Sequence, residues 1–300
     1  MYMTKPVAII IINYKMEWLT VSFVKNELSR IEYPHKIIII NNEATITSNS
    51  FLSAELGAAV IEDVSNIPQD QCNTVVLSSI VNLGFAKANN LGAAFCQKWF
   101  SPDYILFSNN DIQIKDLNVI DSLIGILCDL PDVGVVGPKV IGLDGIEQSP
   151  FPYTSFWVRH VWRHWSSLFY SLNKRIEKFN IDYPQKAKEG YHYYVMGSFF
   201  MVRASDFYNC GMFDPTTFLY AEEMILAERM RAIGKLVYYY PDVTVVHAHG
   251  KTTKKYMCGS INDVLFESEC YYYRKYKKVS KFQLVLGRMT HGLLKRLKKN

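Results

Sequence analysis

One stretch near the middle of the chain constrains the fold more than any other, because an apolar strand runs directly into polar residues. Tyr104 to Phe107 are apolar without alternation, and Asn109, Asn110 and Asp111 follow them. Such a run is typical of a strand covered on both faces, as in a sheet with helices on each side. Sheets of this kind bind ligands at the carboxyl ends of their strands. The three polar residues are therefore expected to face a ligand, unless they only end the strand in a turn.

The same pattern, an apolar strand with a polar end, recurs near the start of the chain. Two segments share it: Val7–Ile12, followed by Asn13 and Tyr14, and Ile37–Ile40, followed by Asn41, Asn42 and Glu43. Between them, Glu17–Ile31 repeats apolar residues at helical spacing. Strand, helix and strand in this order predict a parallel, doubly wound sheet. Asn13, Tyr14 and Asn41 are then expected along its ligand edge.

A further strand, Thr74–Val81, leads into a helix that runs to about Trp99. The first turns of this helix carry Asn82, Gly84, Lys87, Asn89 and Asn90. A glycine permits a close backbone approach, and the amide side chains offer hydrogen-bond donors and acceptors. An ordinary helix that begins with a glycine is the alternative interpretation. The order of strands and helices is less distinct between Ala44 and Gln71, where the pattern indicates a short strand at Ala58–Ile61 and a loop after it.

The second half of the chain continues the α/β pattern around an insertion. We expect a helix at Val119–Leu130, strands at Val133–Val136, Tyr193–Arg203, Val237–Tyr240 and Val243–Val246, and a helix that ends at Ile233. Residues from about Leu143 to Gly190 are instead aromatic and basic without strand alternation. This insertion suits a carbohydrate or lipid-linked acceptor, or a helical hairpin whose aromatic side chains pack on the sheet.

Two acidic residues and a histidine offer acid–base chemistry in this half. Glu222 and Glu223 begin a helix after an aromatic-rich turn, where the helix dipole favours acids. A half-buried carboxylate at this place would have a raised pKa, which suits a general base. His247 and Lys251 follow the last strand and provide an imidazole and an ammonium group.

Composition excludes several classes of protein. The 300 residues are 49% hydrophobic and 20% charged, as in ordinary globular proteins. Six cysteines lie far apart without a Cys-x-x-Cys pair, which argues against a zinc knuckle or a disulfide framework and fits a reducing compartment. No apolar run is long enough to span a bilayer. The chain is therefore expected to fold as one α/β domain of about residues 1–260 with appendages.

Charge is distributed unevenly along the chain. Residues 271–300 hold ten Lys or Arg and no acid, whereas the remainder has 23 basic and 28 acidic residues. The same segment has an apolar helical stripe at Phe282, Val285, Leu286, Met289, Leu293 and Leu297, bordered by Lys281, Arg288, Lys295, Arg296 and Lys299. An apolar face with cationic flanks is typical of a helix at a membrane interface. We therefore expect residues 261–300 to form a basic, amphipathic helical tail that contacts an anionic membrane surface through residues 281–299, unless the stripe packs on the body.

Taken in order, the motifs resemble the family 2 glycosyltransferases, and among them the rhamnosyltransferase-like branch that builds bacterial polysaccharides. The residues that carry the resemblance are Asn13-Tyr14, Asn82-x-Gly84-Phe85-Ala86 with Asn89 or Asn90 and Gly92, Asn109-Asn110-Asp111, Gly197, Phe213-Asp214, Tyr220-x-Glu222-Glu223 with Arg229, and His247. The correspondence runs from about Val7 to Thr253 and omits the insertion. Each motif is weak alone, and their shared order and spacing give the resemblance its weight.

The resemblance implies a GT-A fold, a nucleotide-sugar donor, a divalent cation such as Mn²⁺ or Mg²⁺, and inversion at the anomeric carbon. By motif, Asp111 would be the metal-contacting acid, Glu223 would take the place of the catalytic base beside Glu222, and His247 that of a histidine near the diphosphate or metal. The donor contacts would include Asn13, Tyr14, Asn41, Asn82, Gly84, Lys87, Asn89, Asn109, Asn110 and Lys251. The acceptor would be a glycan or a lipid-linked sugar, reached by a cytoplasmic enzyme at the inner face of the membrane.

Two departures from the family pattern keep other functions open. Asn41-Asn42-Glu43 stands where Asp-Asn is common, and Glu223 stands where an Asp is usual after Glu. A non-catalytic nucleotide-sugar binding protein would tolerate both changes. A nucleotidyltransferase shares this kind of sheet, but it would have a glycine-rich loop after its first strand, and Asn13-Tyr14-Lys15 has no glycine. A nucleic-acid partner is not expected, because no recognised binding motif accompanies the basic tail.

Overall fold

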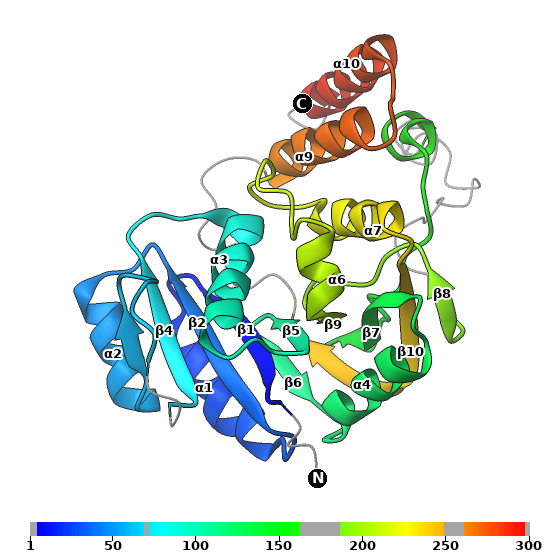
Figure 1. Ribbon diagram of the computed structural model, residues 1–300. Helices are drawn as coiled ribbons and strands as arrows, with labels where there is room; N and C mark the ends of the chain where they lie inside the picture. Colours follow the sequence, from blue (N-terminus) through cyan, green and yellow to red (C-terminus); the bar gives the residue numbers. More distant parts are fainter. Residues whose placement is uncertain (1–4, 69–71, 163–186, 249–260, 298–300) are drawn as a thin grey trace.

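A ten-stranded, mostly parallel sheet organises the computed structural model, with helices on both of its faces (Figure 1). The structure describes residues 5–68, 72–162, 187–248 and 261–297. The strands run in the order β3-β4-β2-β1-β5-β9-β7-β10-β6, and β8 pairs with β10 outside this path. This arrangement confirms the predicted α/β class.

The bounds of the elements are as follows. The strands are β1 (Val7–Asn13), β2 (His35–Asn42), β3 (Ala59–Ile61), β4 (Thr74–Ser79), β5 (Tyr104–Ser108), β6 (Ile112–Ile114), β7 (Val133–Gly142), β8 (Gly190–His192), β9 (Phe199–Arg203) and β10 (Leu236–His247). The helices are α1 (Glu17–Asn26), α2 (Ile46–Leu56), α3 (Gly84–Trp99), α4 (Val119–Asp129), α6 (Ala204–Asn209), α7 (Glu222–Ala232), α9 (Ile261–Lys275) and α10 (Lys281–Leu297). Two short segments, η1 (Leu28–Arg30) and η2 (Val158–Trp162), are a 3₁₀ helix and a π helix.

Successive side chains of β1 enter two different cores. Ile9 and Ile11 pack with buried side chains of α1, α2 and α4 on one face. Ala8 and Ile10 pack with those of α3, α7 and α9 on the other. Because both faces are covered, every position of such a strand favours an apolar residue, which explains its unbroken Ile run.

The strand order changes direction beside β1, and this places the ligand edge. β1 pairs in parallel with β2 on one side and with β5 on the other, so the chain turns back between them. In open α/β sheets this switch point is where ligands bind. In the pairing register, Asn13 lies opposite Asn41. The predicted polar ends of these strands therefore meet at one edge.

Several predicted elements differ from the observed ones. The helix expected over residues 17–31 ends at Asn26 and is followed by η1. The two last predicted strands form a single strand, β10. Pro241, which separates them in the sequence, lies where the pairing with β7 shifts between Tyr240 and Thr244. Such an irregularity accepts a residue without an N–H donor. β9 covers only the end of the predicted strand, and it runs antiparallel to β5 and β7.

Helix α9 is joined to the body of the molecule. Its Phe266, Cys270, Tyr272 and Tyr273 belong to the core on the α3 side of the sheet. Helix α10 follows α9 at the top of the view (Figure 1). The predicted boundary at residue 260 falls just before α9, and the division into a domain and a tail stays a prediction. Of the insertion, the described part includes η2 and β8, and residues 163–186 lie outside the described chain.

Candidate active site

A row of hydrogen-bonded polar side chains lies along the carboxyl ends of the parallel strands. Asn110 Nδ2 donates to Thr20 Oγ1 at 2.9 Å, and Thr20 Oγ1 donates to Asn13 Oδ1 at 2.8 Å. Asn13 Nδ2 then donates to Asn41 Oδ1 at 2.9 Å. All four side chains are buried. The row fixes the strand ends relative to one another, and it brings three predicted donor contacts together through Thr20, which the sequence did not single out.

The end of β4 is tied to β2 in a similar way. Asn42 Nδ2 donates to Asn82 Oδ1 at 2.9 Å, and the same oxygen accepts the Gly84 N–H at 3.0 Å. Gly84 has φ 73°, and a Cβ there would lie 2.2 Å from the carbonyl oxygen of Phe218. The close approach that this glycine permits is thus to the 213–221 loop, which precedes α7.

Other predicted donor contacts vary in exposure. Lys87 is exposed on the first turns of α3, whereas Asn89 is buried and its Nδ2 has no hydrogen-bond partner among the described residues. Tyr14 follows β1, with the ammonium group of Lys15 5.0 Å from its ring centroid. Lys251 lies outside the described residues. The roles of these residues stay predictions.

Asp111 and His247 meet although they lie far apart in the sequence. The Ala248 N–H donates to the Asp111 carbonyl at 3.1 Å, and His247 pairs with Ile112 where β10 meets β6. As a result, His247 Nε2 lies 3.3 Å from Asp111 Oδ1 and 3.4 Å from Asn109 Nδ2. Both the carboxylate and the imidazole are buried.

These side chains fit a divalent cation. Asp111 Oδ1 is buried and accepts no hydrogen bond from any described residue. A carboxylate oxygen beside an imidazole nitrogen is a donor set that suits Mn²⁺, and Mg²⁺ also accepts the carboxylate. The described residues contain no group of three His, Cys, Asp or Glu side chains that would enclose an ion. With Asp111 and His247 as its protein ligands, a cation would still have positions for the oxygens of a diphosphate.

A pair of carboxyl groups lies at the start of α7, with Glu222 buried and Glu223 half-buried. Burial raises the pKa of Glu222 well above its usual range, and the charge of Glu223 raises it further. Burial also raises the pKa of Glu223. Glu223 Oε1 accepts the Gly197 N–H at 3.1 Å, and a Cβ at Gly197 would lie only 2.1 Å from this oxygen. Glycine at position 197 therefore makes room for the Glu223 carboxylate.

The two acidic centres are joined by one short backbone segment. Ser198 follows Gly197, and its carbonyl accepts the Asn109 N–H at 2.8 Å. Asn109 contacts His247, which lies beside Asp111. Gly197 and Ser198 thus connect the Asp111 pair with Glu223.

The turn before α7 has unusual backbone geometry. Tyr220 and Ala221 have φ values of 73° and 68°, in the left-handed region that non-glycine residues seldom adopt. Two such residues in succession are costly and persist only where the surroundings hold them. Here Ser268 Oγ of α9 donates to the Leu219 carbonyl at 2.7 Å.

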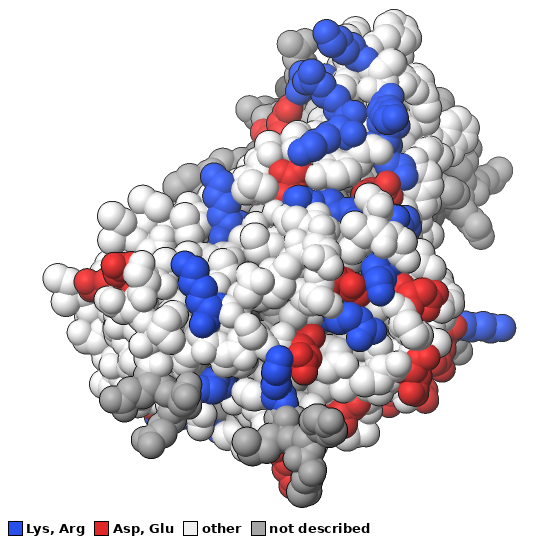
Figure 2. Space-filling model, viewed as in Figure 1, with Lys and Arg blue, Asp and Glu red and all other residues white. Residues whose placement is uncertain are grey.

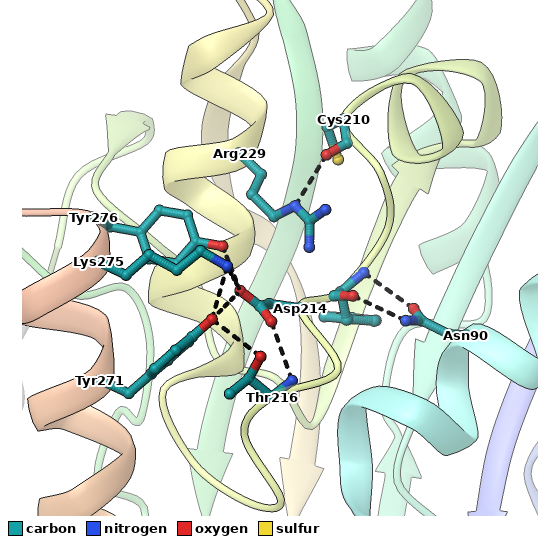
Figure 3. A network of polar contacts seen from close by, with 9 residues as sticks. Asn90, Cys210, Asp214, Thr216, Arg229, Tyr271, Lys275 and Tyr276 are labelled. Atoms are coloured by element: carbon teal, nitrogen blue, oxygen red, sulfur yellow. Dashed lines mark hydrogen bonds and ion pairs between the residues drawn. The ribbon is translucent and has the colours of Figure 1, made fainter.

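Asp214 anchors the other end of the same loop to α9 (Figure 3). Its Oδ2 accepts hydrogen bonds from Tyr271 at 2.8 Å, Lys275 at 2.8 Å and Tyr276 at 2.6 Å. Burial alone would raise the pKa of Asp214, but the bonds from Lys275 and the hydroxyl groups hold it well below the usual range. On the α3 side, Asn90 exchanges two hydrogen bonds with the Phe213 backbone. The loop is therefore held between α3 and α9.

Comparison with known sequences gives relatives of one kind. The chain matches no protein-family model. It is 27% identical over 202 residues to an N-acetylglucosaminyl-diphospho-decaprenol L-rhamnosyltransferase of Mycobacterium tuberculosis, which covers 60% of this chain and 61% of that protein. It is 27% identical over 177 residues to rhamnosyltransferase WbbL of Escherichia coli K12, and this match covers 55% of this chain and 60% of that protein. The matches thus span about three fifths of the curated relatives.

Solved structures of similar fold include proteins bound to nucleotide sugars. GalNAc-T7 with UDP, GalNAc and Mn²⁺ has a TM-score of 0.58 at 15% identity over 92% of this chain and 50% of that chain. Mannosyltransferase PcManGT of Pyrobaculum calidifontis with GDP-Man and Mn²⁺ has a TM-score of 0.54 at 12% identity, over 96% of this chain and 74% of that chain. TarS of S. aureus, residues 1–349 with UDP-GlcNAc, has a TM-score of 0.53 at 10% identity, over 95% of this chain and 72% of that chain. At such low identities the likeness shows a shared fold.

Proposed function

We propose that this chain, a rhamnosyltransferase-like protein of glycosyltransferase family 2 with the GT-A fold, transfers a sugar from a nucleoside diphosphate to a glycan or lipid-linked acceptor in bacterial polysaccharide synthesis. The observation that carries the proposal is the connection of Asp111 and His247 to Glu223 through Gly197 and Ser198. A cation site at one end of a short segment and a half-buried carboxylate at the other are what a displacement at an anomeric carbon needs. The curated relatives, both rhamnosyltransferases, support the same reaction class.

The reaction assigns one role to each acidic centre. The acceptor hydroxyl oxygen forms a bond to the anomeric carbon, the bond from that carbon to the diphosphate oxygen breaks, and the hydroxyl proton moves to Glu223. Attack from the face opposite the leaving group inverts the anomeric configuration. A divalent cation bound by Asp111 and His247 would offset the charge that builds on the diphosphate. Glu222, whose Oε1 has no hydrogen-bond partner among the described residues, supports the placement of Glu223.

Partial burial of Glu223, which raises its pKa, suits it to act as a base. A carboxyl group with a raised pKa holds a proton more strongly than an exposed one, so it accepts the hydroxyl proton more readily in the transition state. The Gly197 N–H points at Oε1 and leaves Oε2 without a hydrogen bond in the described contacts. Gly197 therefore orients the carboxylate as well as making room for it.

Donor turnover tests the proposal directly. The protein is incubated with Mn²⁺ and a panel that includes a rhamnose donor, GDP-mannose and UDP-GlcNAc, and release of the nucleoside diphosphate is followed with and without a lipid-linked acceptor. We expect one donor to raise the melting temperature, because a ligand that binds only the folded state stabilises it. That donor should be consumed, and Asp111→Asn should abolish turnover. Asp103→Asn, at an exposed surface acid, is the control and should leave it unchanged.

Two results would contradict this function. Sugar transfer by Asp111→Asn at the wild-type rate in the presence of a chelator would show that Asp111 does not act at the reacting centre. If the protein binds a donor but neither hydrolyses it nor transfers its sugar to any acceptor tested, it is a non-catalytic nucleotide-sugar binding protein instead.

We also propose that α10 docks the protein on the cytoplasmic face of an anionic membrane. Phe282, Val285, Met289 and Leu293 are 70%, 53%, 66% and 46% exposed, and their spacing places them on one helix face. The opposite face is occupied, since Leu284 and Gly287 are buried and a Cβ at Gly287 would meet Phe156 at 2.5 Å. Four of the six residues of the predicted stripe are thus exposed, while the opposite side of the helix holds α10 in place.

Charge near this face favours anionic lipid as the occupant. Lys and Arg side chains gather over α9 and α10 at the top of Figure 2. Those that are exposed include Arg274, Lys278, Lys281 and Arg288. Each cation near an anionic surface contributes on the order of 1 kcal/mol, so a few suffice for reversible attachment. No described helix is long and apolar enough to cross a membrane.

Co-sedimentation with vesicles tests the docking. We expect the wild type to bind vesicles that contain phosphatidylglycerol, and Phe282→Ser combined with Met289→Ser to lose most of this binding. Ile46→Ser is the control, because Ile46 is 88% exposed on α2, outside this surface. Equal binding by all variants, or no binding by the wild type, would reject this surface as a membrane contact.

A further inference from the structure

A buried glutamine contacts the side of His247 that faces away from Asp111. Gln148 Oε1 lies 2.8 Å from His247 Nδ1, and both side chains are buried. Gln148 follows the turn after β7, and its backbone N–H donates to the Val140 carbonyl at 2.8 Å. A short hairpin therefore holds the glutamine beside the histidine.

The contacts on the two ring nitrogens agree on one tautomer. An amide oxygen accepts and does not donate, so the bond at Nδ1 requires the His247 proton on that nitrogen. With the proton on Nδ1, the neutral ring presents Nε2 as an acceptor, 3.4 Å from Asn109 Nδ2. The Nε2 lone pair then lies 3.3 Å from Asp111 Oδ1, another acceptor without a hydrogen bond from the described residues. Two buried acceptors this close repel each other unless a metal cation or a second ring proton lies between them.

Gly142 makes this arrangement possible. In the pairing of β7 with β10, Gly142 lies directly opposite His247. A Cβ at Gly142 would lie 2.8 Å from Gln148 Nε2 and 2.5 Å from Asp144 Oδ1. Any side chain at this position would therefore displace the glutamine from the imidazole.

We propose that Gln148 is a positioning residue that holds His247 in the Nδ1-protonated tautomer and aims its Nε2 lone pair at the divalent cation beside Asp111. The proposal rests on the proposed function, because it assumes the cation of the transfer reaction. Partners of this kind orient a metal-binding histidine and raise its basicity, and their loss typically weakens metal binding by about 10- to 100-fold. Gly142 contributes by leaving space for the glutamine.

Three variants of the full-length protein test the role by Mn²⁺ affinity, measured in the presence of UDP from the loss of the free Mn²⁺ signal in electron paramagnetic resonance. Gln148→Leu removes the acceptor and should weaken Mn²⁺ binding by about 10-fold or more. Gln148→Glu keeps an acceptor at Nδ1 and should retain binding close to that of the wild type. Gly142→Ala should weaken binding as Gln148→Leu does. Circular dichroism and the melting temperature without metal show that each variant is folded.

The outcomes separate this inference from the proposed reaction. Equal Mn²⁺ affinity in wild type and Gln148→Leu would overturn the positioning role, and sugar transfer by both would leave the proposed function standing. Loss of binding in Gln148→Glu but not in Gln148→Leu would overturn it as well, because it would show that Nδ1 accepts a hydrogen bond. A wild type that binds no Mn²⁺ also overturns it, and transfer measured with a chelator then tells whether the proposed function fails too.

Discussion

Removing the charge of Asp214 should loosen the loop that leads into the helix of the candidate base. In Asp214→Asn the side chain keeps its size, but three donors, Tyr271, Lys275 and Tyr276, lose the carboxylate oxygen on which they converge. Hydrogen bonds to a charged group contribute about 1.5–3 kcal/mol each and neutral ones about 0.5–1.5 kcal/mol. Three bonds weakened by roughly 1 kcal/mol each give a loss of about 3 kcal/mol.

The assay combines thermal unfolding with turnover. A loss of this size lowers the melting temperature of a chain of this length by roughly 5–10 °C. Turnover measured well below the melting temperature should fall as well, because Asp214 fixes the loop that leads to Tyr220, Ala221 and Glu223. Donor affinity should change little, since the donor contacts lie on other elements.

Lys275→Met is the matched control for this effect. The Lys275 side chain is 53% exposed, so its ion pair with Asp214 contributes no more than about 1 kcal/mol. In the Asp214→Asn background, Lys275→Met should cost almost nothing, because its partner charge is already gone. A drop in melting temperature of less than about 2 °C in Asp214→Asn corresponds to a loss below about 1 kcal/mol, and it would refute the anchoring role. Equal costs of Lys275→Met in both backgrounds would refute the pairing.

Further predictions concern the carboxyl groups and the glycine beside them. Gly197→Ala should displace the Glu223 carboxylate and reduce turnover, whereas Gly125→Ala, where a Cβ meets nothing within 4 Å, should not. Because burial raises the folded pKa of Glu222, its effect on stability is most favourable below the usual carboxyl pKa and is lost as pH rises. Calorimetry should therefore show Glu222→Gln stabilising at about pH 8 and nearly neutral at about pH 4. Burial alone would raise the pKa of Glu269, but the charge of Arg159 brings it down to about 2. The ionised Glu269 therefore stabilises the fold above about pH 5, and this stabilisation should fade in acid unfolding as the pH falls toward 2.

The strands were predictable because burial on both faces leaves a direct record in the sequence. Val7–Ile12 contains only apolar residues since each of its faces is covered by helices. Helix α2 left no such record, because Leu52 is its only buried residue and Ile46 and Phe51 are exposed. Its start is instead marked by the capping box of Thr45 and Ser48, a signal that a search for apolar periodicity does not use.

The site was predictable in its single residues but not in their connections. Asp111 and His247 each follow an apolar strand, and this pattern selects both, but only the pairing of β6 with β10 brings them together. Gln148 lies just after a turn, in a segment without any periodic pattern, so nothing in the sequence relates it to His247. Helix α9 lies within the predicted helical tail of residues 261–300, but no apolar stripe was identified on it, because it buries polar Ser268 and Glu269 against the body.

The turnover of Glu223→Gln, compared with its binding of the donor, tests most directly whether Glu223 is the base. The substitution keeps the shape of the side chain and removes its ability to accept a proton. We expect a fall in kcat of roughly 100-fold or more with donor affinity near that of the wild type. Turnover at the wild-type rate would contradict the assignment of Glu223 as the base, and a larger loss in Glu222→Gln would show that the two carboxyl groups have exchanged roles.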